Sequence, residues 1–117
     1  MSDTHDFDLL VIGSGPSGQS AAIQASKLHK RVALIEKRRR VGGVCTFTGT
    51  IPSKTLREAI LSTTGGGLDD GFTVRTRPEM VDLIDRVNQV IASETSVVRN
   101  SLARNDITVI EGEASFI

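Results

Sequence analysis

Apolar residues cluster in two short runs near the start of the chain, and each run predicts a β-strand. Phe7–Ile12 is mostly apolar and ends at Gly13, which is typical of a strand buried on both faces of a parallel sheet. Arg31–Ile35 predicts a second buried strand, and Gln19–Lys30 predicts a helix of small residues that can lie close to a sheet. Strand, helix and strand within about 30 residues form a βαβ unit, right-handed by default.

Two longer segments predict helices. The first is expected from near Pro52 to about Thr63, where Gly65–Gly67 and the polar residues 68–77 end it. Pro78–Arg104 predicts an amphipathic helix on the order of 40 Å long, at about 1.5 Å per residue. Its apolar residues recur at steps of three and four, interrupted by Glu94, and are Met80, Ile84, Val87, Ile91, Val98 and Leu102.

The end of the chain completes the predicted sheet. Ile107–Ile110 is expected as a third strand, Ala114–Ile117 as the start of another, and Lys37–Phe47 as a loop after the second strand. Each successive crossover adds a strand on the same side. The expected fold is therefore α/β, with a parallel sheet of order 3-2-1 and a long helical insertion.

The composition indicates one globular domain and excludes several classes of protein. The 117 residues hold 14 Lys and Arg against 14 Asp and Glu, and this zero net charge argues against nucleic-acid binding. Hydrophobic residues make up 38% of the chain, as in a folded domain rather than a disordered one. The single cysteine, Cys45, excludes a disulfide scaffold and fits a reducing compartment.

The first residues look like neither an export signal nor a membrane anchor. Met1–Asp6 is acidic and polar, and the apolar run Leu9–Ile12 is far too short to span a bilayer. The chain has no Trp or Tyr to stack on bases. We therefore expect a soluble, cytoplasmic protein with no metal site and with neither a membrane nor a nucleic acid as its partner.

The sequence GSGPSG at residues 13–18 is typical of a dinucleotide-binding turn. Gly13 permits a tight turn off the strand, Gly15 lets the backbone approach a pyrophosphate, and Gly18 allows close packing of helix on strand. The helix N-terminus offers N–H groups and a positive dipole end to the phosphates. The strand before, the helix after and the second strand give this motif the context that a turn with incidental glycines lacks.

Charged residues end the second predicted strand. Glu36, 18 residues after Gly18, can accept hydrogen bonds from a ribose diol. The basic run Lys37–Arg40 allows two interpretations, a site for the 2′-phosphate of NADP or a solvated loop. Glu36 would repel a 2′-phosphate, which favours the loop, although Lys37 can still lie along the adenosine half of a cofactor.

A second glycine-rich segment, Val41–Lys54, leads into the predicted helix with one thiol and one lysine. The residues alone suggest a loop that lines an anion or a cofactor. A lone cysteine is more often inert packing than a nucleophile, and a lone lysine is more often solvated than catalytic.

The same segment resembles the active-site stretch of the pyridine nucleotide–disulfide oxidoreductases, the flavoproteins that include lipoamide dehydrogenase and glutathione reductase. That family carries GGxCxxxxCxPSK after a dinucleotide-binding βαβ unit and an acidic ribose residue. This chain matches at Gly42, Gly43, Cys45 and the final PSK, and Gly112–Phe116 resembles the family's adenine-flanking G-x-A-x-F turn. Thr50 stands where the family has its second redox cysteine, as in the soluble pyridine nucleotide transhydrogenases, a branch that lacks the redox pair.

This resemblance implies a Rossmann-like FAD-binding domain, of which residues 1–117 are an N-terminal part without the family's NAD(P) and dimerisation domains. The implied function is hydride transfer between NADPH and NAD through FAD, with no redox disulfide, because the Thr50 hydroxyl cannot form one with Cys45. We expect the 117-residue chain alone to be inactive. The alternatives are a fragment of a lipoamide dehydrogenase-like flavoenzyme and a non-catalytic module for nucleotide binding or protein interaction.

The family's site residues carry over to matching positions. Cys45, Thr50 and Lys54 would lie beside the isoalloxazine ring, with Lys54 at the flavin's reactive edge. The residues expected to hold FAD are Gly13, Ser14, Gly15, Pro16, Gly18, Glu36, Lys37, Gly42, Gly43, Val44, Cys45, Lys54 and Ala114. NAD(P) would bind outside this chain. The first strand lacks the neighbour that later sequence supplies in the family, so we expect a homo-oligomer formed through this sheet edge or through the apolar stripe of the long helix.

Overall fold

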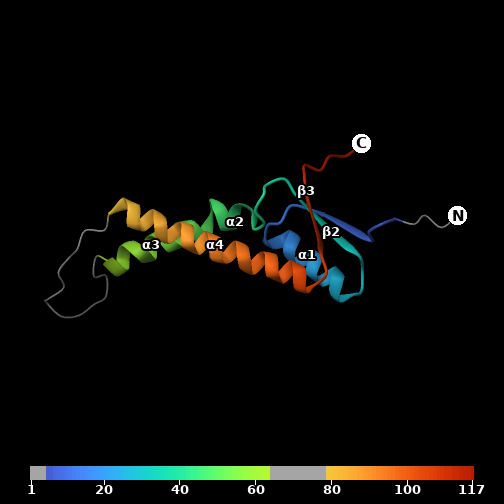
Figure 1. Ribbon diagram of the computed structural model, residues 1–117, viewed down its shortest axis with the longest axis horizontal. Helices are drawn as coiled ribbons and strands as arrows, with labels where there is room; N and C mark the ends of the chain where they lie inside the picture. Colours follow the sequence, from blue (N-terminus) through green and yellow to red (C-terminus); the bar gives the residue numbers. More distant parts are fainter. Residues whose placement is uncertain (1–4, 64–78) are drawn as a thin grey trace.

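The computed structural model describes residues 5–63 and 79–117, and it contains a three-stranded parallel sheet. The strands are β1 (Leu9–Ile12), β2 (Val32–Glu36) and β3 (Thr108–Glu111), in the spatial order β1-β2-β3 (Figure 1). Leu9 lies beside Val32, and Ala33 lies beside Thr108. The predicted parallel sheet with β2 in the middle is therefore confirmed.

Both long crossovers pack on one face of the sheet. Helix α1 (Pro16–Lys27) contributes Ala22 to the core, and α4 (Met80–Arg104) contributes Val98 and Leu102 to the same cluster. The strand residues of this cluster are alternate ones, and alternate side chains of a strand share a face. These residues are Leu9, Val11, Val32 and Leu34. Two right-handed crossovers that add strands in one direction require this one-sided arrangement.

The opposite face of the sheet stays largely open. Leu10 and Ile12 are 56% and 58% exposed, so the prediction that the first strand is buried on both faces is wrong for this chain. Ala33 of the central strand is fully buried, because a strand neighbours it on each side. The difference between β1 and β2 follows from their places at the edge and in the middle of the sheet.

Helix α1 is shorter at its end than predicted and begins earlier. It starts at Pro16 rather than Gln19, because proline suits the first turn of a helix. It ends at Lys27 rather than Lys30, where His29 adopts a positive φ of 58° and turns the chain toward β2. The amino ends of β1 and β2 are then joined by Asp8, whose carboxylate accepts hydrogen bonds from the backbone N–H (2.7 Å) and the guanidinium of Arg31.

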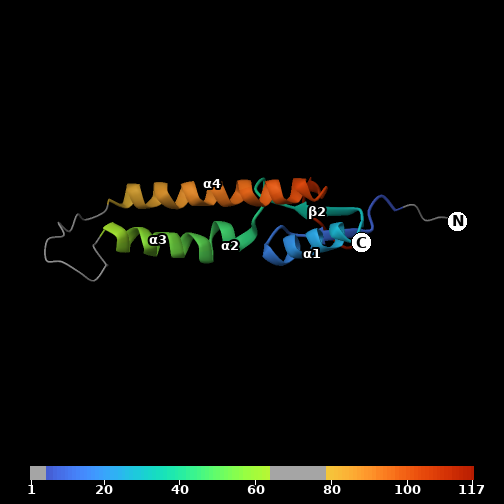
Figure 2. The ribbon, with the colours of Figure 1, turned by 90° about the horizontal axis from the view of Figure 1, so that it is seen from below.

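Helices α3 (Thr50–Thr63) and α4 lie side by side and extend away from the sheet (Figures 1 and 2). A short helix α2 (Gly43–Phe47) precedes them, so the prediction of a loop over Lys37–Phe47 is wrong for its last residues. Gly42 turns the chain with a φ of +136°, and the buried Thr46 hydroxyl donates to the Gly42 carbonyl at 3.1 Å. This bond closes the first turn of α2.

The buried side of α4 differs from the predicted stripe. Val98 and Leu102 are buried as expected, but Leu83 is buried in place of Met80 and Ile84, which are exposed. Leu83 lies near the start of α4, the helix that packs against α3. Pro78, the triglycine 65–67 and the connector 68–77 lie outside the described residues.

The last residues form no strand. Gly112–Ile117 is irregular, and Phe116 is almost fully exposed, so the prediction of a further strand over Ala114–Ile117 is wrong for this chain. Within residues 5–63 and 79–117, no helix combines the length and apolarity needed to cross a membrane.

Candidate functional site

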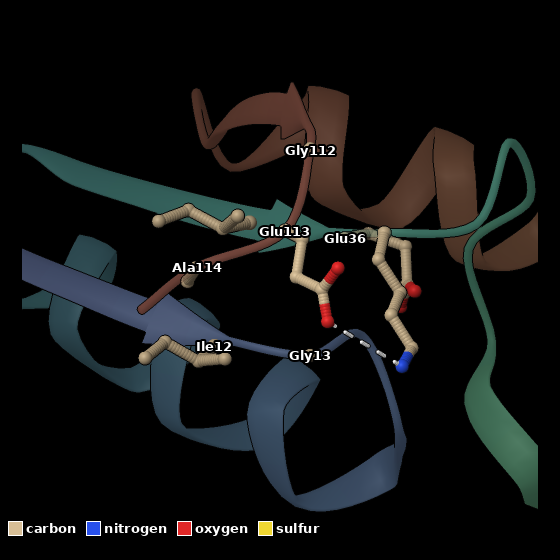
Figure 3. Close-up of a pocket in the computed structure, with 8 residues that line it drawn as sticks. Ile12, Gly13, Glu36, Gly112, Glu113 and Ala114 are labelled. Carbon is tan, nitrogen blue, oxygen red and sulfur yellow. Dashed lines mark ion pairs between the residues drawn. The ribbon is translucent and has the colours of Figure 1, made fainter. Parts of the chain in front are cut away.

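A cavity of about 260 Å³ lies at the carboxyl ends of the three strands. Three segments far apart in the sequence meet there: the end of β1 with its glycine turn, the end of β2, and the turn after β3 (Figure 3). Its lining residues are Ile12, Gly13, Ile35, Glu36, Lys37, Gly112, Glu113 and Ala114. In open α/β sheets, ligands bind at this edge of the sheet.

The glycine turn is tightly packed at Gly18 and leaves free space at Gly15. Gly13 has a φ of +94°, which favours glycine, and a Cβ on Gly18 would collide with the Gly13 carbonyl oxygen and lie 3.2 Å from Val11 Cγ1. A Cβ on Gly15 would meet nothing within 4 Å. No side chain caps the N-terminus of α1, so its first N–H groups are available to an anion. These observations match a pyrophosphate approaching Gly15.

The buried Glu36 is held by three hydrogen bonds. Its Oε2 accepts from the backbone N–H of Ser14 at 3.0 Å and from the Ser14 hydroxyl, and its Oε1 accepts from the backbone N–H of Arg38 at 3.0 Å. The Ser14 hydroxyl accepts in turn from the Gly42 N–H at 3.0 Å. Glu36 therefore ties the glycine turn to the segment that follows β2.

These bonds set the charge of the carboxylate. Burial alone would raise the pKa of Glu36, but the hydrogen bonds from the Ser14 hydroxyl and from the N–H groups of Arg38 and Ser14 outweigh it. The net result is a pKa below the usual range of a glutamate. Glu36 is therefore an anion at neutral pH and can accept a hydrogen bond from a hydroxyl at the cavity.

The glycine pair Gly42–Gly43 packs against the glycine turn at residues 13–18. Gly43 has a φ of +70°, and a Cβ there would lie 2.7 Å from the Gly15 Cα. Only glycine lets these two segments approach so closely. The predicted roles of Gly42 and Gly43 as cofactor neighbours stay predictions, but both residues lie beside the glycine turn.

The turn after β3 supplies the far wall of the cavity. Figure 3 shows Gly112, Glu113 and Ala114 passing across the ends of the strands, and the Gly112 N–H donates to the Glu36 carbonyl at 2.9 Å. Lys37 Nζ lies 4.0 Å from Glu113 Oε1, which joins the two sides of the cavity in an exposed ion pair. The sequence thus predicted four of the lining residues, namely Gly13, Glu36, Lys37 and Ala114.

Comparison with known proteins identifies the family. A family model described as FAD dependent oxidoreductase matches residues 8–109, which is most of the chain. The chain belongs to the FAD-dependent oxidoreductases. This membership explains why the glycine turn, Glu36 and the turn after β3 meet at one edge of the sheet, where a Rossmann-like fold holds its dinucleotide.

Similar proteins within the FAD-dependent oxidoreductases include soluble pyridine nucleotide transhydrogenases. The protein of that name from Mycobacterium bovis (strain BCG / Pasteur 1173P2) is 49% identical over 116 residues, covering 96% of this chain and 25% of that protein. The one from Enterobacter sp. (strain 638) is 38% identical over 120 residues, covering 100% of this chain and 26% of that protein. The chain therefore spans about a quarter of the length of these relatives.

A solved structure gives the same fold. The HOCl-induced flavoprotein disulfide reductase RclA from Escherichia coli matches with a TM-score of 0.75 and 32% identity, over 92% of this chain and 22% of that chain. Its Cu(II) complex matches with a TM-score of 0.78. The predicted α/β, Rossmann-like fold and the resemblance to the transhydrogenase branch are both confirmed.

The residues predicted to lie beside the flavin are separate from the cavity of this FAD-dependent oxidoreductase chain. Cys45 lies half-buried in α2, Thr50 begins α3, and Lys54 is exposed on α3. Lys54 Nζ lies 3.8 Å from Glu58 Oε1, one turn along the helix. None of these three residues lines the cavity, so their predicted role at a flavin stays a prediction.

Sequence reasoning missed half of the cavity lining. Ile12 and Ile35 were assigned only to strands, and Gly112 and Glu113 only to a motif. Position within the strands was the available signal, because each isoleucine is at or next to the carboxyl end of its strand. Ser14 is fully buried, so the structure gives it a supporting place behind the cavity. Arg38–Arg40 are exposed and do not line the cavity.

Proposed function

We propose that this chain is the FAD-binding portion of an oxidoreductase that transfers hydride between NADPH and NAD by way of FAD. The observation that carries the proposal is the cavity at the strand ends, where a glycine turn, an ionised Glu36 and the Gly112–Ala114 turn converge. The transhydrogenase names of the relatives support the reaction. We take residues 1–117 as part of one FAD-binding domain.

The residues that would hold FAD fall into two groups. Gly13, Gly15 and the N-terminus of α1 would receive the pyrophosphate, and Glu36 with the Gly112–Ala114 turn would receive the adenosine. When bound, FAD supplies the redox chemistry, taking hydride from one nicotinamide and giving it to another. The protein's part is to bind and orient, with the Lys54 ammonium available near the predicted flavin side.

The chain's single thiol limits its redox chemistry. Thr50 offers a hydroxyl where the disulfide-reducing family members have a second cysteine, so Cys45 has no partner for a disulfide within this chain. A direct route between nicotinamides is the simplest chemistry that remains. The sequence holds a single GxGxxG motif, which we assign to FAD, and we expect these 117 residues alone to catalyse no transfer.

Nucleotide titration of the chain and of Glu36→Gln tests the proposal. ADP, which carries the adenosine and pyrophosphate groups, is expected to perturb the amide NMR signals of the glycine turn and of Gly112–Ala114. Glu36→Gln should weaken ADP binding by roughly tenfold, because it replaces a hydrogen bond to a charged acceptor, worth about 1.5–3 kcal/mol, by one to a neutral amide, worth about 1 kcal/mol. FAD itself should bind only at micromolar or higher concentrations, because few contacts offset its ordering cost.

Glu111→Gln is the matched control, since Glu111 lies directly beside Glu36 on β3 but outside the cavity. It should leave the ADP affinity within about twofold. Shifts spread evenly over the surface, or equal affinities for the chain and Glu36→Gln, would contradict the proposed site. Submicromolar FAD binding would contradict the expectation that this chain makes few contacts to FAD.

The chain is also expected to form a homo-oligomer. β1 is an edge strand with Leu10 and Ile12 exposed, and α4 exposes Met80, Val81, Ile84 and Val97. An open strand edge beside apolar side chains is a template for pairing with a second copy, and zero net charge provides no opposing repulsion.

Sedimentation at micromolar concentration measures this association. Leu10→Lys should shift the chain toward monomer if the sheet edge mediates it, whereas Val97→Lys should do so if the α4 stripe does. A monodisperse monomer of the unaltered chain would refute self-association by either surface.

A further inference from the structure

The side chain of Ser14 lies where three segments of the nucleotide site meet. It is fully buried between the glycine turn, the end of β2 and the segment before α2. Its hydroxyl donates to Glu36 Oε2 and accepts from the Gly42 N–H at 3.0 Å. A hydroxyl has one proton to donate, and here that proton goes to Glu36. The backbone N–H and the hydroxyl of Ser14 both donate to Glu36, so neither donor is available to a ligand.

We propose that Ser14 is a positioning residue of the nucleotide site, which orients Glu36 and fixes the Gly42–Gly43 segment against Gly15 through one hydroxyl. This inference rests on the proposed function. Ser14 acts through Glu36 and Gly42 and does not itself contact the nucleotide. Through Ser14, Glu36, the proposed acceptor for the ribose, and Gly42–Gly43, the segment beside the proposed pyrophosphate site, belong to one hydrogen-bonded unit.

The two carboxylate oxygens of Glu36 have different hydrogen-bond partners. A carboxylate accepts about four hydrogen bonds, two at each oxygen. Oε2 already takes two from Ser14, whereas Oε1 takes one from the Arg38 N–H. Oε1 is therefore the oxygen with capacity for a ribose hydroxyl, and Ser14 determines which oxygen that is.

The unit responds to protonation of Glu36. The pKa of Glu36 lies below its usual range because the Ser14 and Arg38 hydrogen bonds favour the charged form over the effect of burial. Protonation at low pH weakens the Ser14–Glu36 bond and so loosens the contact to Gly42. The charged groups that share cavities with Glu36 come from three parts of the chain. They are Lys37, Arg38 and Arg39 on its own segment, Glu111 at the end of β3 with Glu113 in the turn after it, and Arg99 of α4.

Three NMR measurements on the chain and on Ser14→Ala test this inference. The carboxyl pKa of Glu36 should rise in Ser14→Ala, and hydrogen exchange at the Gly42 amide should accelerate at least tenfold. The loss of ADP affinity on acidification should move to higher pH in the variant. Ser20→Ala, an exposed serine of α1 beyond its first turn, is the matched control and should change none of these. Ser14→Thr, which keeps the hydroxyl, should restore the pKa of Glu36.

The unaltered chain supplies a measurement that does not depend on any variant folding. The Gly42 amide signal should titrate with the same midpoint as the Glu36 carboxyl, since Ser14 joins them. Different midpoints, or an unchanged Glu36 pKa in folded Ser14→Ala, would overturn the role of Ser14 while leaving nucleotide binding intact. Failure of ADP to bind the unaltered chain would instead overturn the proposed function and leave the shared titration standing.

Discussion

Replacing Gly18 with alanine is expected to lower the free energy of unfolding by about 2–4 kcal/mol, a large part of the stability of a domain this small. The added Cβ would collide with the Gly13 carbonyl oxygen and approach Val11 Cγ1 at 3.2 Å. The collision is with backbone at the tight turn, which cannot rotate away as a side chain can. Urea unfolding followed by circular dichroism measures the loss.

Gly112→Ala is the matched control for this change. A Cβ on Gly112 would meet nothing within 4 Å, so the free energy of unfolding of Gly112→Ala should stay within about 0.5 kcal/mol of that of the unaltered chain. An unchanged midpoint in Gly18→Ala would show that α1 can move away from β1 at little cost. The close helix–strand contact would then not explain the third glycine of the motif.

Replacing Gly15 with alanine should instead weaken nucleotide binding while the fold persists. Gly15 has a φ of −66°, which alanine adopts freely, and the Cβ would point into open space. Its cost to stability is at most about 1 kcal/mol, from the preference for glycine over alanine at an N-cap. The same Cβ would occupy the space that a pyrophosphate needs, so ADP affinity should fall roughly tenfold or more.

Two measurements on one sample separate these effects. The urea midpoint of Gly15→Ala reports the fold, and an ADP titration followed by amide NMR shifts reports the site. Ser20→Ala, which changes an exposed serine of α1 beyond its first turn, should leave both the urea midpoint and the ADP affinity unchanged. ADP binding by Gly15→Ala as tight as in the unaltered chain would mean that the phosphates do not approach this glycine.

The sheet could be predicted because its signals are local and mutually consistent. Each strand is an apolar run, the turn after β1 is glycine-rich, and a parallel neighbour follows from the intervening helix. The burial of β1 could not be predicted in the same way. A run such as Leu9–Ile12 has the same sequence whether or not a layer covers its second face, and here Leu10 and Ile12 are exposed.

The parts of the candidate site that belong to a sequence motif could be predicted. The parts that depend on side-chain packing could not. Glu36 and the glycines follow from spacing, but nothing in the sequence indicates that the Ser14 hydroxyl would lie between Glu36 and Gly42. The helix Gly43–Phe47 was missed because the glycine pair at its start, Gly42 and Gly43, predicts a loop. The buried face of α4 was misassigned because Leu83 and Ile84 fit a three- and four-residue spacing equally well.

The path of the chain between β2 and β3 has a consequence for folding. β1, α1 and β2 are continuous in sequence, whereas β3 joins β2 only after α2, α3 and α4 have intervened. Closing this longer loop costs more entropy, so we expect β3 to dock last. The turn Gly112–Ala114 directly follows β3, so the hydrogen bond from the Gly112 N–H to the Glu36 carbonyl can form only after β3 has docked on β2. We therefore expect this wall of the cavity to form in the final step of folding, and a nucleotide that binds there would stabilise the docked state of β3.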